Sequence, residues 1–164
     1  GNIYQTLTWR DATMETISPP QDRLEPGTKI RAITKHPDYR QIFMFSAITW
    51  NRHLIHYNQQ QARKEGHRDV VIQRALLGNY LAQCISGWIG GHGTLSRLEW
   101  KVRQSAFAGD ELVCRGNVME RTMEKDKAVV ICALEIRNQH DDVVVTATAQ
   151  VRLHDAGSVG STGR

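Results

Sequence analysis

The sequence has few cysteines, and none in a pattern that forms a disulfide framework or binds a metal. Its 164 residues include three, Cys84, Cys114 and Cys132, which are widely separated and lie among apolar neighbours. Secreted disulfide scaffolds and zinc sites instead place cysteines at characteristic short spacings. A chain of this length buries roughly two thirds of its unfolded surface, so it needs neither device for stability. We therefore expect a globular protein with buried free thiols and no metal.

Long apolar runs are also missing. No segment approaches the roughly 18 consecutive apolar residues that a membrane helix requires. Gly1–Arg10 lacks the basic and then apolar layout of a secretory signal. We therefore expect a cytoplasmic protein that makes no membrane contact.

Runs of one charge are absent as well, although positive charge is in excess. Lys and Arg number 21 against 17 Asp and Glu, for a net charge of +4. An excess of this kind favours an anionic partner. Because no basic run carries the interleaved aromatic residues of a nucleic-acid-binding surface, we expect a phosphate-bearing small molecule or carrier and no nucleic acid.

The hydrophobic pattern that is present predicts an α+β domain. Val70–Trp88 is apolar on nearly every face, which is typical of a helix surrounded by the rest of a protein, and Asp69 is placed to cap it. Upstream of this helix, turn residues and helix formers predict a strand over Thr28–Thr34 and helices over Tyr39–Thr49 and Asn58–Glu65.

Four strands are expected after the long helix. Apolar and polar residues alternate over Leu98–Val102, Leu112–Val118 and Val143–Leu153, and Ala128–Arg137 is more continuously apolar. Runs of this kind with short links predict antiparallel strands that show one face to a core. A curved sheet wrapped around one buried helix is the hot dog fold, which is therefore the fold that we predict.

The same pattern predicts the domain organisation. Residues 1–155 are expected to form a single domain, and the Gly- and Ser-containing residues 156–164 a disordered tail. One such sheet leaves strand edges and apolar surface uncovered. We therefore also expect a homodimer built from two sheets side by side.

The densest cluster of polar functional groups is Ser46–Tyr57, which reads SAITWNRHLIHY. This segment resembles the MaoC-like hydratases and dehydratases, and in particular their branch of type 2 hydroxyacyl-thioester dehydratases and mesaconyl-CoA hydratase-like proteins. The resemblance extends to Val71-Ile72-Gln73 and to the turn AFAGDEL at 106–112, and it spans about Leu24–Leu153. The Gly-Asp turn resembles a scaffold feature of the family rather than a catalytic one.

The resemblance implies reversible hydration of a 2-enoyl thioester, or dehydration of a 3-hydroxyacyl thioester, carried on coenzyme A or an acyl carrier protein, without a cofactor. The motif of the broader family is an Asp, an Asn two residues later and a His three further on. Here Thr49 and Asn51 take the first two positions, and His56 comes two residues late. Threonine is usual in the resembling branch. The resemblance therefore implies that His56, Asn51 and Thr49 are catalytic.

The chemistry agrees with these residue types. Adding water across a double bond conjugated to a thioester requires a base for the water and an acid for the α-carbon. It also requires donors for the charge that develops on the carbonyl oxygen. A histidine titrates close to neutrality, so His56 is suited to be both base and acid. The unpaired N–H groups at the start of a buried helix are suited to hold the oxygen.

The resemblance also indicates substrate-binding residues. In the resembling branch the helix start usually reads Gln-Gly-Pro, whereas here it is Gln73-Arg74-Ala75. We expect Gln73 and Arg74 to contact the substrate, and the Arg74 side chain either to crowd this place or to bind a substrate carboxylate. Trp50 and Tyr57 are expected to form walls of the binding site.

Several alternatives stay open. His56 and His53 are both candidates for structural roles, and as a pair they mimic two metal ligands, although no cysteine or carboxylate is placed beside them. Because Thr49 and Arg74 depart from the broader family pattern, one alternative is a non-catalytic partner subunit of a heteromeric dehydratase. Another is a thioesterase on the same fold. That activity would need a carboxylate or a His-Gly-Gly-like element near the helix start, and Val70–Leu77 contains neither.

Overall fold

The computed structural model describes residues 24–125 and 127–154, so the tail expected at 156–164 lies outside the described residues. The described chain begins with a strand, continues through three helices and closes with four strands. In order, the elements are β1 (Lys29–Lys35), α1 (Tyr39–Thr49), the 3-10 turn η2 (Leu54–His56), α2 (Gln59–Lys64), α3 (Arg74–Ile89), the 3-10 turn η3 (Gly90–His92), β2 (Gly93–Val102), β3 (Leu112–Glu124), β4 (Lys127–Arg137) and β5 (Val143–Leu153).

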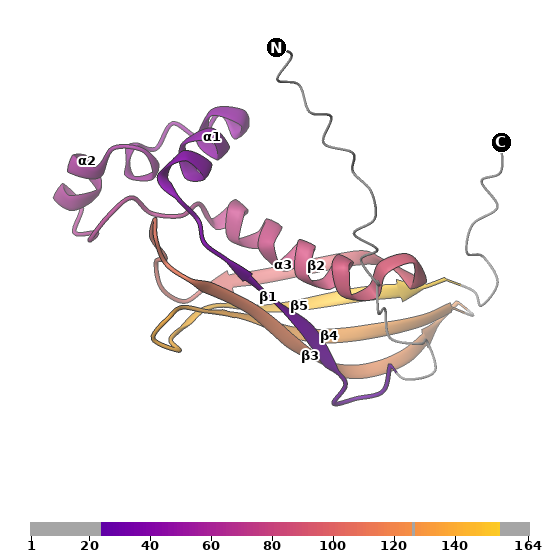
Figure 1. Cartoon of the computed structure of the whole chain (residues 1–164). Helices are drawn as coiled ribbons and strands as arrows, with labels where there is room; N and C mark the ends of the chain where they lie inside the picture. The colour runs from indigo at the N-terminus through magenta and orange to yellow at the C-terminus, as the bar shows by residue number, and fades with distance from the viewer. Residues whose placement is uncertain (1–23, 126, 155–164) are drawn as a thin grey trace, which may run out of the picture.

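The five strands form one antiparallel sheet in the order β1-β3-β4-β5-β2. The sheet curves along α3, which lies on its concave face (Figure 1). The inward side chains of α3 are almost fully buried, as with Leu81 and Ile85 at 0% exposed. They pack against alternate residues of the strands, among them Cys132 and Ile136. The predicted hot dog fold is thereby confirmed, as is the period-two alternation of the strands.

The long helix begins four residues later than the sequence predicts. Asp69 does not cap α3, whose N-cap residue is Gln73. The backbone before it is extended instead, because its polar groups pair with other segments: the Val71 N–H donates to the Ile55 carbonyl at 2.9 Å and the Ile72 N–H donates to the Ala106 carbonyl at 2.9 Å. We call the extended segment 68–73 the strap. The expected start at Val70 was therefore wrong, because contacts between segments override helix propensity there.

An overhang made of α1, η2 and α2 projects from the end of the sheet where α3 begins (Figure 1). α1 has the bounds that the sequence predicts, because Asp38 accepts from the Gln41 N–H at 2.8 Å and so caps its first turn. It ends where Trp50 takes a left-handed backbone conformation with φ of 54°. That reversal directs the following loop back towards the start of α3.

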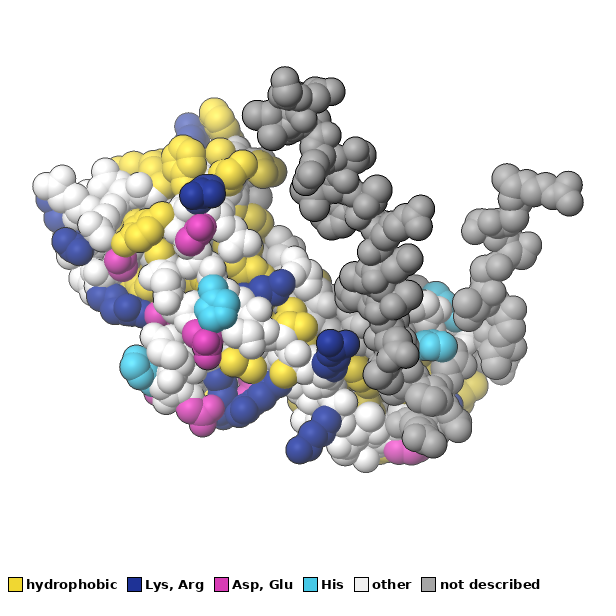
Figure 2. Space-filling view, in the orientation of Figure 1, with side chains coloured by type: hydrophobic (Ala, Val, Ile, Leu, Met, Phe, Trp, Pro, Cys, Tyr) yellow, Lys and Arg dark blue, Asp and Glu magenta, His cyan; other side chains and the backbone are white. Residues whose placement is uncertain are grey.

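The overhang carries most of the exposed apolar surface. Figure 2 shows hydrophobic side chains gathered over the position of α1. Apart from Met119 and Met123, the exposed large apolar side chains of residues 24–125 and 127–154 all belong to one short stretch: Tyr39, Phe43, Met44, Ile48, Trp50, Leu54 and Tyr57. A concentration of this kind is typical of a surface that a partner covers.

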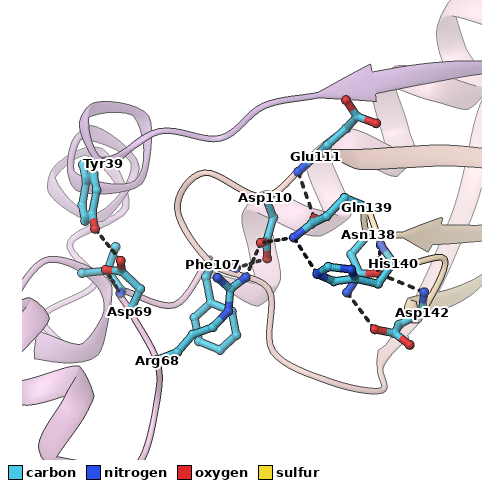
Figure 3. Close-up of polar contacts among 11 residues, drawn as sticks. Tyr39, Arg68, Asp69, Phe107, Asp110, Glu111, Asn138, Gln139, His140 and Asp142 are labelled. Atoms are coloured by element: carbon cyan, nitrogen blue, oxygen red, sulfur yellow. Dashed lines mark hydrogen bonds and ion pairs between the residues drawn. The ribbon is translucent and has the colours of Figure 1, made fainter.

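Asp110 holds the strap to the sheet (Figure 3). This carboxylate is 2% exposed and accepts from the Phe107 N–H at 2.8 Å and from the Gln139 amide at 3.0 Å. It also pairs with the Arg68 guanidinium, which lies 4.4 Å from the centre of the Phe107 ring. One carboxylate thereby joins the strap, the β2–β3 loop and the β4–β5 turn.

Within the described parts of the chain, 24–125 and 127–154, no helix is long and apolar enough to cross a membrane.

The first prediction concerns Asp110. We expect Asp110→Ala to lower the free energy of unfolding by about 2–4 kcal/mol, because a buried N–H and a guanidinium lose their acceptor. Urea denaturation measures this change. Activity per folded molecule should persist, and Glu111→Ala, which alters an exposed neighbouring carboxylate, should change stability by no more than about 0.5 kcal/mol. Selective loss of activity with unchanged stability would contradict a scaffold role.

The second prediction concerns assembly. β1 and β2 are the two edge strands of the sheet, and unpaired edges of this length favour association. We expect a dimer at micromolar concentration in sedimentation velocity experiments. A protein that sediments as a monomer under those conditions would refute this expectation.

Candidate active site

A cleft of about 670 Å³ lies between the overhang and the start of α3. It receives residues from α1 and the loop after it, from the strap and from the first turn of α3. Strand β2 and the β2–β3 loop complete it. The lining residues are Phe45, Thr49, Asn51, His56, Val71, Ile72, Gln73, Arg74, Ala75, Leu77, Trp100, Val102, Ser105 and Ala106. Five of the seven predicted site residues therefore meet in one cleft.

His56 is held by the strap in a defined tautomer. Its Nδ1 lies 2.7 Å from the Val71 carbonyl oxygen. Since a carbonyl only accepts, Nδ1 carries the proton and Nε2 has a free lone pair when the ring is neutral. Burial lowers the pKa of His56, the Val71 carbonyl opposes that shift, and nearby His53 and His67 add to the lowering. At neutral pH the ring is therefore a neutral base.

Asn51 and Thr49 present complementary groups to the same cleft. The Asn51 Oδ1 accepts from the His53 N–H at 3.1 Å, which leaves the amide NH₂ without a partner among the described residues. The Thr49 hydroxyl donates to the Phe45 carbonyl at 2.6 Å. Thr49 therefore offers lone pairs and Asn51 offers donors, so together they can hold a water molecule but neither can act as a base.

The start of α3 brings uncapped backbone donors to the cleft. The Gln73 side chain makes no capping bond to this helix, so the first-turn N–H groups of Arg74 and Ala75 have no acceptor within the helix. Gln73 is 1% exposed, and its amide NH₂ donates to the Ile42 carbonyl at 2.7 Å and to the Ser46 hydroxyl at 2.8 Å. Gln73 thus ties α1 to α3, and its own Oε1 is buried without a partner in the described structure.

The Arg74 side chain lies against Trp100 of β2. Its guanidinium is 4.9 Å from the centre of the indole and donates to the Trp100 carbonyl at 2.9 Å. The indole N–H in turn donates to the Arg74 carbonyl at 3.1 Å. Arg74 and Trp100 therefore contact each other through two hydrogen bonds and a stacked guanidinium at the edge of the cleft.

Trp50 and Tyr57 do not join the cleft. They border a separate hollow of about 150 Å³ beneath α1, together with Phe43 and Arg52. Trp50 is 76% exposed, and the Tyr57 hydroxyl donates to the Arg52 carbonyl at 2.8 Å. Only Asn51 touches both spaces. The structure thus separates these two aromatic residues from the other predicted site residues.

Trp100 and Ser105 line the cleft although sequence reasoning assigned them no site role. The sequence pattern predicts that Trp100 is an inward-facing residue of a strand and that Ser105 is part of a loop. A weak signal was available in Gly78: a Cβ there would lie 2.5 Å from the Trp100 ring. A glycine inside an apolar helix indicates a close approach of this kind but not the element that approaches.

A larger hollow of about 780 Å³ lies over β1, β3, β4 and β5. Its charged residues are Lys29, Arg115 and Glu135, and the last two pair with each other at 2.9 Å. It has no histidine, cysteine or uncapped helix start among the described residues that border it. The smaller cleft is therefore the candidate active site.

Histidines lie near the cleft without forming a metal site. The rings of His53 and His56 are 5.9 Å apart between centroids. Within residues 24–125 and 127–154, no group of three or more His, Cys, Asp or Glu side chains is arranged to hold a metal ion.

The third prediction follows from the burial of His56. We expect its imidazole to titrate below the ordinary pKa of about 6.5, because protonation places a charge in a half-buried position. NMR of ¹⁵N-labelled imidazoles measures the midpoint, and the signal that disappears in His56→Gln assigns it. The tautomer should show the proton on Nδ1. A midpoint above pH 7 would contradict this account.

Comparison with known proteins shows which family this chain is similar to. A profile of hydroxyacyl-thioester dehydratase type 2 matches residues 4–108. The R-hydratase PhaJ1 from Pseudomonas aeruginosa superposes with a TM-score of 0.74 at 21% identity, over 82% of this chain and 84% of that one. The (R)-hydratase from A. caviae involved in PHA biosynthesis gives 0.72 at 20%, over 80% and 98%.

A chain from a complex of two proteins is similar as well. In the ChsH1-ChsH2 complex from Mycobacterium tuberculosis, one chain superposes with a TM-score of 0.70 at 16% identity, over 79% of this chain and 98% of that one. Likenesses at these identities show the fold. Comparison with curated protein sequences gives no significant match.

The family profile spans more than half of the chain, and its residues 4–108 include β1, the overhang, α3, β2 and part of the β2–β3 loop. The solved structures share the sheet and the long helix. The resemblance seen in the sequence is thus confirmed, and the chain belongs to the hydroxyacyl-thioester dehydratase type 2 family.

Proposed function

We propose that this protein catalyses reversible hydration of 2-enoyl thioesters, and equally dehydration of 3-hydroxyacyl thioesters, in the cleft around His56. One observation carries the proposal: a neutral histidine with a free Nε2 and an uncapped helix start line the same cleft. The first supplies a base and, once protonated, an acid. The second supplies donors for a developing oxyanion.

In the hydration direction, His56 Nε2 takes a proton from water as the water oxygen bonds to the β-carbon. The electron pair of the double bond moves onto the α-carbon and the thioester oxygen, which the N–H groups of Arg74 and Ala75 hold. The imidazolium then returns its proton to the α-carbon, and the carbonyl re-forms. The Val71 carbonyl stabilises the transient imidazolium through Nδ1–H. Dehydration is the reverse sequence.

Asn51 and Thr49 are assigned to the water. The free Asn51 NH₂ donates to the water oxygen, and the Thr49 hydroxyl, whose proton is used by Phe45, accepts one water hydrogen. This leaves the second water hydrogen for His56. One histidine therefore does the work of the acid and base pair of the broader family, because Thr49 has no titratable group.

The carrier is coenzyme A or an acyl carrier protein, which are both anionic. The net charge of +4 suits either carrier. A cytoplasmic location and the absence of nucleic-acid binding stay predictions from the sequence.

A non-catalytic partner subunit is the second candidate. Two observations favour it: Thr49 stands where the broader family has a carboxylate, and exposed apolar side chains cover the overhang next to the cleft. The similarity to the ChsH1-ChsH2 complex is compatible with a heteromer. A homodimer is the simpler assembly. Thioesterase activity is less well supported, because none of the described residues lining the cleft is a carboxylate.

The fourth prediction tests His56 directly. We expect His56→Ala to lower turnover of enoyl-CoA substrates by about 10² to 10⁴-fold, the usual loss for a general acid or base. Loss of the conjugated thioester absorbance follows the reaction, over a panel of chain lengths. Thermal unfolding and binding of a saturated acyl-CoA should change little, since the helix start and cleft walls hold the thioester.

Matched variants make this test specific. His53→Ala removes a neighbouring imidazole that does not line the cleft and should leave most of the activity. Thr49→Val and Asn51→Ala should cost less than His56→Ala, because each holds water without transferring its proton. Near-normal activity in His56→Ala would exclude the mechanism. An inactive wild-type protein that copurifies with a second hot dog chain would instead support the hypothesis of a non-catalytic partner subunit.

A further inference from the structure

Arg74 places a long cationic side chain at the helix start that the proposed mechanism uses. Arg74 lines the cleft, and its backbone N–H belongs to the first turn of α3, which no side chain caps. Among the described residues no carboxylate lies within ion-pair distance of its guanidinium. Instead, the guanidinium stacks on the face of the Trp100 ring and donates a hydrogen bond to the backbone carbonyl of the same residue.

Trp100 is itself tightly placed. Its indole lies against Gly78, where even a methyl group would come within 2.5 Å of the ring. The indole N–H donates to the Arg74 carbonyl at 3.1 Å. Cation–π attraction is strongest on indole. The stacked guanidinium and the hydrogen bond from the indole N–H together hold the ring between the helix and the guanidinium. The pair is therefore preorganised before any substrate arrives.

We propose that Trp100 is a positioning residue that keeps the Arg74 guanidinium away from the carbonyl-binding N–H groups of α3. Without the indole, the guanidinium keeps only its hydrogen bond to the backbone carbonyl of residue 100. It is then freer to rotate over the helix start, where its bulk hinders the approach of the thioester carbonyl. Trp100 thereby makes an arginine compatible with catalysis at the first position of this helix. The inference rests on the proposed function, because it assigns those N–H groups to the thioester oxygen.

The test is a double-mutant cycle between Trp100→Leu and Arg74→Ala. We expect Trp100→Leu to lower kcat/KM for the best enoyl-CoA of the wild-type panel by about 10-fold when Arg74 is present, which corresponds to a coupling within the usual range for contacting residues. In the Arg74→Ala background the same substitution should cost no more than about 3-fold. Affinity for butyryl-CoA, a saturated thioester, is measured by calorimetry for the same four proteins and should follow the same pattern.

A purely structural role of Trp100 gives a different result. The loss on Trp100→Leu would then be equal with and without the arginine, and that outcome overturns the proposal. Leu98→Ala is the matched control, because Leu98 points inward from the same strand without touching Arg74, and its effect should be additive with Arg74→Ala. If Trp100→Leu does not fold, Trp100→Phe keeps a ring but removes the N–H, and its smaller loss should also vanish in the Arg74→Ala background.

The outcomes separate this inference from the proposed function. Hydration by the wild type with an additive cycle overturns the inference alone. A wild type that binds butyryl-CoA but hydrates no enoyl thioester overturns the proposed function, and the binding cycle then decides the inference. Absence of both hydration and thioester binding overturns both.

Discussion

The backbone of Val71 is the constraint on which the site depends. Its N–H donates to Ile55 and its carbonyl accepts from His56, so one residue of the strap sets both the path of η2 and the tautomer of the imidazole. The next residue, Ile72, is paired with Ala106 across the cleft. Because these bonds hold the strap extended, α3 begins only at Arg74, and Arg74 and Ala75 of its uncapped first turn line the cleft.

The cleft is consequently rich in donors and poor in charge-balancing carboxylates. The helix start and the Asn51 amide all present N–H groups, while the acceptors are the His56 nitrogen and the Thr49 hydroxyl. An environment of this kind stabilises negative charge on a ligand oxygen more than it stabilises a neutral carbonyl. The same environment leaves the Arg74 guanidinium without an ionic partner. Stacking on Trp100 therefore determines where that side chain lies.

Local signals predict the elements whose boundaries are set by their own residues. α1 runs over Tyr39–Thr49 as expected, since Asp38 caps it locally, and β5 runs over Val143–Leu153. The start of α3 was misplaced because Val70 and Val71 are apolar enough to read as helix. The Val71 backbone bonds to Ile55 and His56, and the Val70 carbonyl accepts from the Ala108 N–H, so the partners lie 16, 15 and 38 residues away in sequence. Local periodicity carries no information about such partners.

The sequence by itself determined the fold class, the family and the residue types of the site, because hydrophobic periodicity and a dense polar motif are written in consecutive residues. The predicted site residues Thr49, Asn51, His56, Gln73 and Arg74 line one cleft, although they come from two helices, a 3-10 turn and the segments between them. Only the tertiary structure decided that Trp50 and Tyr57 border another hollow, that Gln73 ties two helices together and that the Arg74 guanidinium stacks on Trp100. These features are side-chain orientations and contacts between segments far apart in the chain. They are set by packing and hydrogen bonds, which exist only once the sheet has closed around its helix.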